Sequence, residues 1–361
     1  MRKAAIGCGL VLALTMLAFL VVLLSPPGRR IAGAVKYVMQ TDEGASLETG
    51  EDVIKYLEAH PDRYALAAWD VGAEEQGLFH DADTAWPLAS TVKIIPLARA
   101  SEELAAGRWT ASTPLPEVEL LYLPETDGNA HPEAKAAGDT STIGGAIHAM
   151  IRFSDNAATD ALLFRLGRIT PEVPGLPTPH PLSGTSLLAD TKWINDGGVD
   201  DAAWAISSAL MDGGVKYDLS TPISEQEKMA RDLDNKGTAR AFAKLIERIF
   251  ADDEQRASPD AEQHERYALA RKELSWPMEF ESNQRDFKVR ATKGGSLPGV
   301  LTSASYGETK SGQRRVVALF MHDLPFATWV GLSKSFAHQQ LERDLLSSPD
   351  ALQRLRPRLA R

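Results

Sequence analysis

A serine and a lysine three residues apart are the first residues in this chain whose types and spacing could do chemistry. Ser90 and Lys93 lie in the run Trp-Pro-Leu-Ala-Ser-Thr-Val-Lys-Ile-Ile-Pro-Leu, and this spacing places both side chains on one face at the start of a helix. An amine one turn along can take the proton of a serine hydroxyl if burial or cationic neighbours keep it neutral part of the time. The free N–H groups at a helix N-terminus can hold a developing oxyanion. The pair therefore predicts covalent catalysis, with Ser90 as the nucleophile.

Taken alone, the Ser-x-x-Lys pattern is weak, because about one match is expected by chance in a chain of ordinary composition. A serine that caps a helix and a solvated lysine would explain it equally well. Two later motifs favour the catalytic interpretation: Ser-Asp-Asn at residues 154–156 and Lys-Gly-Gly at residues 293–295. The order along the chain is Ser-x-x-Lys, then Ser-Asp-Asn, then Lys-Gly-Gly.

This ordered triplet resembles the active-site motifs of class A β-lactamases and the related penicillin-binding proteins. The similarity extends from about residue 63 to residue 346, because a strand pair precedes Ser90, a helix leads into Ser-Asp-Asn, and strands and a final helix follow Lys293. The resemblance implies a serine hydrolase that opens β-lactam amides through an acyl-enzyme on Ser90. It also implies an α+β fold of the β-lactamase/transpeptidase type, in which an antiparallel sheet is flanked by helices and carries an inserted all-helical lobe.

The resemblance also implies roles around the nucleophile. Lys93 would accept the Ser90 proton during acylation, Ser154 would carry a proton between Lys93 and the leaving nitrogen, and Asn156 would hydrogen-bond the substrate's side-chain amide. A helix-to-helix turn held by Asx-type hydrogen bonds is the alternative explanation of Ser-Asp-Asn. Both interpretations can hold for the same residues.

The third motif would line the opposite wall of the cleft. In the family pattern, the charge of Lys293 attracts the substrate carboxylate, and the backbone N–H of Ser296 joins that of Ser90 in holding the oxyanion. Gly294 and Gly295 would let the strand backbone approach the ligand closely. A β-bulge with a solvated lysine is the alternative.

Two departures from the family pattern limit what the resemblance implies. The residue after the motif lysine is usually Thr or Ser, whose hydroxyl binds the carboxylate, but here it is Gly294. The glutamate and asparagine that hold the deacylating water are also not found after Ser-Asp-Asn. Asp190 has a plausible distance but is followed by Ile194 at the asparagine position, Glu172 comes too early, and Glu225 and Glu227 are possible but unsupported.

Composition excludes other classes of function. The net charge of −10 and the pI near 5.4 argue against nucleic-acid binding, which needs a basic face. The eight histidines show no metal-ligand spacing, and no glycine-rich phosphate loop follows a strand. We therefore expect no metal or other cofactor, a β-lactam or cell-wall peptide as the small-molecule substrate, and a monomer.

The N-terminal segment differs from the rest of the chain. Arg2 and Lys3 precede an uncharged stretch from Ala4 to Leu24 that is long enough to span a bilayer. We expect an uncleaved membrane anchor with an extracytoplasmic (periplasmic) catalytic domain, since the family's targets lie there. Cleavage near Ala32-Gly33-Ala34, giving a secreted form, is the alternative. The only cysteine, Cys8, lies in the apolar stretch, so the body can form no internal disulfide.

The remaining pattern divides the chain into two regions. Residues 1–36 would be the anchor and linker, and residues 37–361 the catalytic domain, with a sheet lobe at about 52–85 and 286–346 and a helical lobe at about 86–285. Alternating residues predict strands near 62–70, 288–293, 301–307 and 314–322. Periodic apolar residues predict helices at 91–106, 142–153, 157–166, 201–211, 238–251 and 328–346. The cleft would lie at the seam between the lobes.

Two alternatives to an efficient β-lactamase remain open. If deacylation is slow, the protein would behave as a penicillin-binding protein or a D-alanyl-D-alanine peptidase. A cell-envelope binding protein that has lost turnover would fit Gly294 and the missing Glu-Asn pair, whereas the intact Ser90, Lys93 and Lys293 oppose it.

Overall fold

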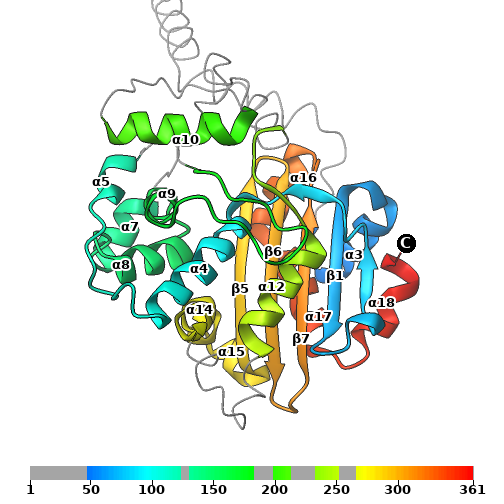
Figure 1. Ribbon diagram of the computed structural model, residues 1–361. Coiled ribbons are helices and arrows are strands. Elements are labelled where there is room, and N and C mark those ends of the chain that lie inside the picture. The colour runs from blue at the N-terminus through cyan, green and yellow to red at the C-terminus, as the bar shows by residue number, and fades with distance from the viewer. Residues whose placement is uncertain (1–46, 123–129, 183–197, 213–231, 252–265, 361) are drawn as a thin grey trace, which may run out of the picture.

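The computed structural model describes residues 47–122, 130–182, 198–212, 232–251 and 266–360 (Figure 1). The expected membrane anchor, Cys8 and the acidic candidates Asp190, Glu225 and Glu227 lie outside these residues. None of the helices in the described part of the chain has the length and apolarity that a membrane span needs.

A five-stranded antiparallel sheet forms the centre of the molecule, with the strand order β2-β1-β7-β6-β5 (Figure 1). Its strands come from both ends of the chain, so that Tyr64 of β1 pairs with Met321 of β7. The strand bounds are Tyr64–Asp70 (β1), Leu78–His80 (β2), Phe287–Leu297 (β5), Val300–Thr309 (β6) and Arg314–Met321 (β7). A separate two-stranded sheet pairs β3 (Ala85–Pro87) with β4 (Lys236–Thr238).

Both faces of the sheet are buried. Strand β1 shows the reason, because its side chains alternate between two apolar cores: Ala65 and Trp69 belong to one, and Tyr64 and Leu66 to the other. On the first face, α12 (Ala239–Ala251) packs with stacked aromatic rings such as Phe250 on Tyr306. The second face is covered by α3 (Gly50–Ala59), α16 (Phe326–Ser335), α17 (Ala337–Ser347) and α18 (Ala351–Leu359).

A group of helices lies beside the β5 edge of the sheet (Figure 1). Their bounds are Ile94–Ala105 (α4), Glu117–Leu121 (α5), Ala130–Ala137 (α7), Ile143–His148 (α8), Asn156–Leu166 (α9), Gly198–Met211 (α10), Ala268–Leu274 (α14) and Glu281–Asp286 (α15). Short 3₁₀ turns are η1 (Pro61–Arg63), η2 (Glu74–Gln76), η3 (Ala89–Lys93) and η8 (Trp276–Glu279), and a π-helix, η4, covers Ala149–Phe153. The α+β class with an antiparallel sheet flanked by helices is thereby confirmed.

The structure corrects several expected elements. The prediction of one helix at 328–346 is wrong, because Phe336 adopts a left-handed conformation (φ 54°) that ends α16 and starts α17. The helix expected from residue 91 begins as the 3₁₀ turn η3, and only Ile94 onward is α-helical. Helices α3 and α18 were not predicted. The helix α12 falls within the sequence range expected for the helical lobe but packs against the sheet.

Candidate active site

Ser90 lies in the 3₁₀ turn η3, directly after a residue with a strained backbone. Ala89 has a φ of 46°, a region that residues other than glycine seldom occupy. Neighbouring segments hold this conformation from two sides. The buried carboxylate of Asp234 accepts hydrogen bonds from the backbone N–H groups of Leu88 (2.9 Å) and Ala89 (2.6 Å), and Thr302 Oγ1 donates to the Leu88 carbonyl (2.6 Å). The position of the nucleophile is therefore fixed by contacts that the Ser-x-x-Lys motif does not reveal.

Lys93 is fully buried and connects the first motif to the second. Its Nζ donates to Asn156 Oδ1 (2.7 Å) and to the carbonyl (2.5 Å) and hydroxyl (3.2 Å) oxygens of Ser154. Three acceptors around one ammonium group fix the side chain in place. The predicted base and the Ser-Asp-Asn segment thus lie in direct contact.

The backbone around Ser154 brings its side chain to this position. The π-helix η4 ends at Ser154, which has a left-handed conformation (φ 59°). Asp155 then caps α9 by accepting from the N–H of Ala158 (2.8 Å), and it contacts His131 Nδ1 (3.0 Å). The Asx-type turn weighed from the sequence is therefore present, and the same turn presents Ser154 to both lysines.

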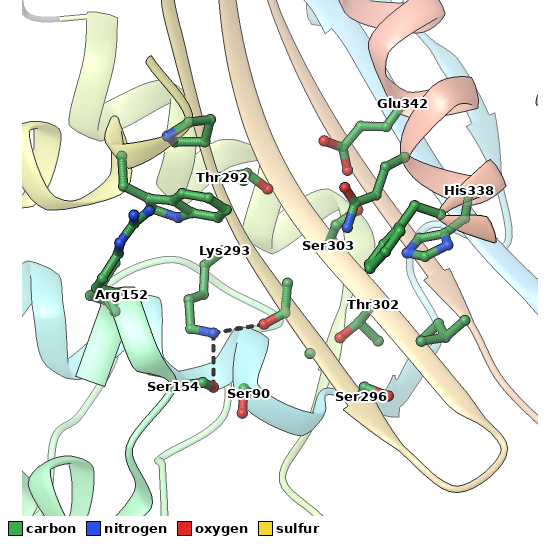
Figure 2. A pocket seen from close by; sticks show the side chains of 18 of the residues that line it. Ser90, Arg152, Ser154, Thr292, Lys293, Ser296, Thr302, Ser303, His338 and Glu342 are labelled. Atoms are coloured by element: carbon green, nitrogen blue, oxygen red, sulfur yellow. Dashed lines mark hydrogen bonds between the residues drawn. The ribbon is translucent and has the colours of Figure 1, made fainter. Parts of the chain in front are cut away.

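Lys293 approaches the same hydroxyl from β5. Its Nζ lies 3.0 Å from Ser154 Oγ and 2.8 Å from the Gly294 carbonyl oxygen (Figure 2). Burial, together with the nearby charge of Lys93, holds the pKa of the Lys293 amine well below its usual value. The hydroxyl of Ser154 is thus shared between two lysine amines, which is an arrangement that can relay a proton.

Gly295 brings β5 against the nucleophile turn. A Cβ at this position would lie 2.6 Å from the backbone nitrogen of Ser90 and 2.7 Å from the Leu88 carbonyl oxygen. At Gly294 a Cβ would meet only the Thr302 carbonyl oxygen, at 3.5 Å. Close approach of the two backbones therefore requires glycine at 295 and not at 294.

The side chain of Ser296 is engaged elsewhere. Its Oγ accepts a hydrogen bond from the indole N–H of Trp329 on α16 (3.1 Å). This hydroxyl is thus hydrogen-bonded to the helix layer on the second face of the sheet. The role of the Ser296 backbone N–H as an oxyanion donor stays a prediction.

A cavity of about 600 Å³ opens at these residues. It is lined by Ser90, Ser154 and Lys293 at one end and continues past β5 to His338 and Glu342 on α17 (Figure 2). Strand β5 also contributes Gly294, Gly295 and Ser296 to the lining of the cavity. Asn156 is not among the lining residues and is hydrogen-bonded to Lys93. All seven sequence-predicted site residues thus gather at this cleft or directly beneath it.

Asp234 is the site residue that the sequence analysis missed. Burial raises the pKa of its carboxyl from 3.8 to about 6, although the N–H groups of Ala89 and Leu88 oppose the shift. No sequence motif marks Asp234, which lies shortly before the strand β4. A buried acid next to a nucleophile can be recognised only once both are placed in space.

Among the described residues that line the cavity, Glu342 is the one acidic side chain, and it accepts a hydrogen bond from the Ser305 hydroxyl (2.8 Å). Glu172, already judged too early in the sequence, pairs with Arg248 at 2.6 Å, which lowers the pKa of its carboxyl. Within the described ranges no group of three or more His, Cys, Asp or Glu could hold a metal ion.

Fold and site together define a protein of the β-lactamase/transpeptidase-like class. A family model described as the β-lactamase enzyme family matches residues 49–328, which include all three motifs. The chain belongs to this family. None of the curated proteins that were compared matches the sequence.

Solved structures with a similar arrangement include a β-lactamase from Sphaerobacter thermophilus (18% identity, TM-score 0.47, 80% of this chain and 96% of that chain). A reconstructed ancestral class A β-lactamase has 15% identity and a TM-score of 0.47 over 82% of this chain and 99% of its own. The protein called PBP-A has 16% identity and a TM-score of 0.45 over 81% and 96%.

Proposed function

We propose that the protein is a serine hydrolase that opens β-lactam amides through an acyl-enzyme on Ser90. The observation that carries the proposal is the hydroxyl of Ser154, which lies between the amines of Lys93 and Lys293 at 3.2 and 3.0 Å. Such a chain of exchangeable protons is what acylation of a serine and protonation of a leaving nitrogen require.

These contacts support the following acylation step. Lys93 takes the proton of the Ser90 hydroxyl as its oxygen attacks the carbonyl carbon, and the backbone N–H groups of Ser90 and Ser296 hold the oxyanion. When the carbon–nitrogen bond breaks, the Ser154 hydroxyl gives its proton to the leaving nitrogen and is reprotonated by one of the two lysines. The lowered pKa of Lys293 supports this relay, because an amine that loses its proton more readily can exchange protons with the Ser154 hydroxyl.

Hydrolysis of the acyl-enzyme is the less supported half of the reaction. Asp190 is the candidate base for the deacylating water, and it lies outside the described residues. If that water is poorly held, the acyl-enzyme persists and the protein behaves as a penicillin-binding protein or a D-alanyl-D-alanine peptidase. A few kcal/mol in the placement of one water separates the two outcomes.

The test is time-resolved intact mass of the full-length protein mixed with a penicillin or a cephalosporin. We expect an adduct with the mass of the whole drug on wild-type protein and none on Ser90→Ala. Turnover within seconds would mark a β-lactamase, and a lifetime of minutes or more would mark the slow enzyme. Absence of any adduct together with no consumption of drug would refute the proposal and favour the non-catalytic binding protein.

The protein is proposed to lie outside the cytoplasm, with the segment from Ala4 to Leu24 anchoring it in the membrane. Sequencing of the mature N-terminus in membrane and soluble fractions tests this. A mature chain that begins at or beyond Val35 would contradict an uncleaved anchor.

A further inference from the structure

Exposed aromatic side chains gather at the cavity that holds Ser90. In the described part of the chain the large apolar residues that are more than half exposed are Leu120 (54%), Phe280 (51%) and Phe336 (53%). Both phenylalanines line the catalytic cavity, and Leu120 does not. Leaving such surface in water is unfavourable, so its concentration at one cavity indicates a binding role.

The backbone at Phe336 adds a second, independent observation. A bulky side chain with φ of 54° is uncommon, and strained residues persist mainly where function requires them. Here Phe336 separates α16 from α17, and its ring is exposed at the cavity. A glycine would adopt this conformation without strain but would provide no ring.

A third aromatic residue completes the wall. Trp276 in η8 lines the same cavity, and the guanidinium of Arg152 lies 4.9 Å from the centre of its ring. We call Trp276, Phe280 and Phe336 the aromatic rim. Aromatic side chains bind ring-shaped groups well, because they offer a large rigid apolar face at a small entropic cost.

The charged groups near the rim are already paired within the protein. Arg152 forms an ion pair with Glu279 (2.6 Å), and Arg290 lies 3.6 Å from Glu342. Ser303 and Gln339, which also line the cavity, offer an uncharged hydroxyl and an uncharged amide. The surface beyond Lys293 thus combines rings with neutral hydrogen-bonding groups.

The position of the cavity relates this surface to the reacting bond. Its lining along β5 runs from Ser296 back to Arg290, so it extends from the nucleophile past Lys293 toward the start of the strand. Lys293 contacts Ser154, the group that would protonate the leaving nitrogen. The part of a substrate beyond that nitrogen therefore points toward the aromatic rim, a step that rests on the proposed function.

We propose that the aromatic rim is a binding subsite for the leaving-nitrogen side of the substrate, and that it takes an uncharged ring bearing hydrogen-bonding groups. An acylamino sugar and an aromatic carboxamide share this chemistry. Two probes distinguish these sources: methyl N-acetyl-β-D-glucosaminide and benzamide. N-methylacetamide, which has the amide but no ring, is the control probe.

The experiment is a ligand-observed NMR titration of the full-length protein with each probe. We expect at least one ring probe to bind more tightly than N-methylacetamide, and Phe336→Ala and Phe280→Ala each to weaken it about five-fold. The matched variant Leu120→Ala removes an equally exposed side chain outside the cavity and should bind like wild type. Phe280→Ala also serves if Phe336→Ala does not fold.

The outcomes separate this inference from the proposed function. If no ring probe binds better than N-methylacetamide, or if Leu120→Ala weakens binding as much as Phe336→Ala, the subsite is refuted whatever the state of Ser90 acylation. A bound ring probe should also slow acylation of Ser90 by a penicillin in wild type and lose this effect in Phe336→Ala. Binding without competition would overturn the placement on the leaving side, and competition would support it.

Discussion

At the scale of single residues, the site depends on charges that are kept close together and out of water. Lys93 and Lys293 both reach the hydroxyl of Ser154, and both are buried. Burial and the neighbouring charge of Lys93 lower the pKa of Lys293, which favours its neutral amine. The neutral amine is the form of lysine that can accept a proton.

Asp234 gives a prediction about pH. Because its pKa is raised from 3.8 to about 6 in the fold, the folded state favours the neutral form, and this contribution to stability is complete below about pH 4 and lost as the pH rises through 6. Asp234→Asn lacks the titration. The free energy of unfolding of the variant relative to wild type should therefore rise by about 2 kcal/mol between pH 4 and pH 7.

Urea unfolding of both proteins across this pH range measures the difference. Asp62→Asn, at an exposed position, is the control variant for the removal of one surface carboxylate. A difference between Asp234→Asn and wild type that stays constant from pH 4 to pH 7 would rule out a buried, titrating Asp234.

At the scale of elements, the contact between β5 and the turn η3 fixes the position of Ser90. Gly295→Ala would place a Cβ 2.6 Å from the Ser90 nitrogen, which forces the strand and the nucleophile turn apart. Since loss of one oxyanion donor costs about 10²–10³ in rate, we expect acylation of Ser90 to slow by about 100-fold.

Gly294→Ala is the matched control, because its Cβ would make only an ordinary contact at 3.5 Å. Its acylation rate should stay within about three-fold of wild type. Both rates are measured by quenched-flow mass spectrometry with one penicillin. Equal rates for the two variants would show that the close approach at 295 does not position the nucleophile.

The helices and strands show both where prediction from the sequence succeeded and where it failed. Long periodic segments such as α9, α12 and β7 were recognised, and the three motifs located the residues that meet at the cleft. The break at Phe336 was missed because the apolar stripe continues across it, and phenylalanine does not signal a left-handed residue. The hydrogen bond between Ser296 and Trp329 could not be predicted, because the two residues are distant in sequence. Asp234 likewise acts through tertiary contacts alone.

At the scale of the whole molecule, the folded unit extends beyond the residues that the family model matches. The match ends at residue 328, inside α16. Helices α17 and α18 follow it and still cover the second face of the sheet. The last helix also binds the first strand directly, since the Tyr64 hydroxyl donates to the Leu359 carbonyl at 3.0 Å.

Removal of residues 351–361 should therefore destabilise the protein. The deletion takes away the buried side chains of Leu352, Leu355 and Leu359, at a cost of about 5 kcal/mol from burial of apolar surface. Urea unfolding at one pH measures it. Arg354→Ala on the same helix removes partly exposed ion pairs with Asp344 and Asp350 and should change stability by less than about 1 kcal/mol. An unchanged unfolding midpoint in the deletion would show that α18 is not part of the cooperative unit.

The antiparallel pairing of β1 with β7 also dictates an order of assembly. Tyr64 cannot pair with Met321 until all residues between them have been synthesised. Closing so long a loop is slow. The helices between the two halves of the sheet have closer partners in sequence and can associate earlier. During synthesis, the edge of β1 that pairs with β7 therefore stays unpaired after β2 has been made, and a chaperone or a translocation channel could bind the incompletely folded chain in this interval.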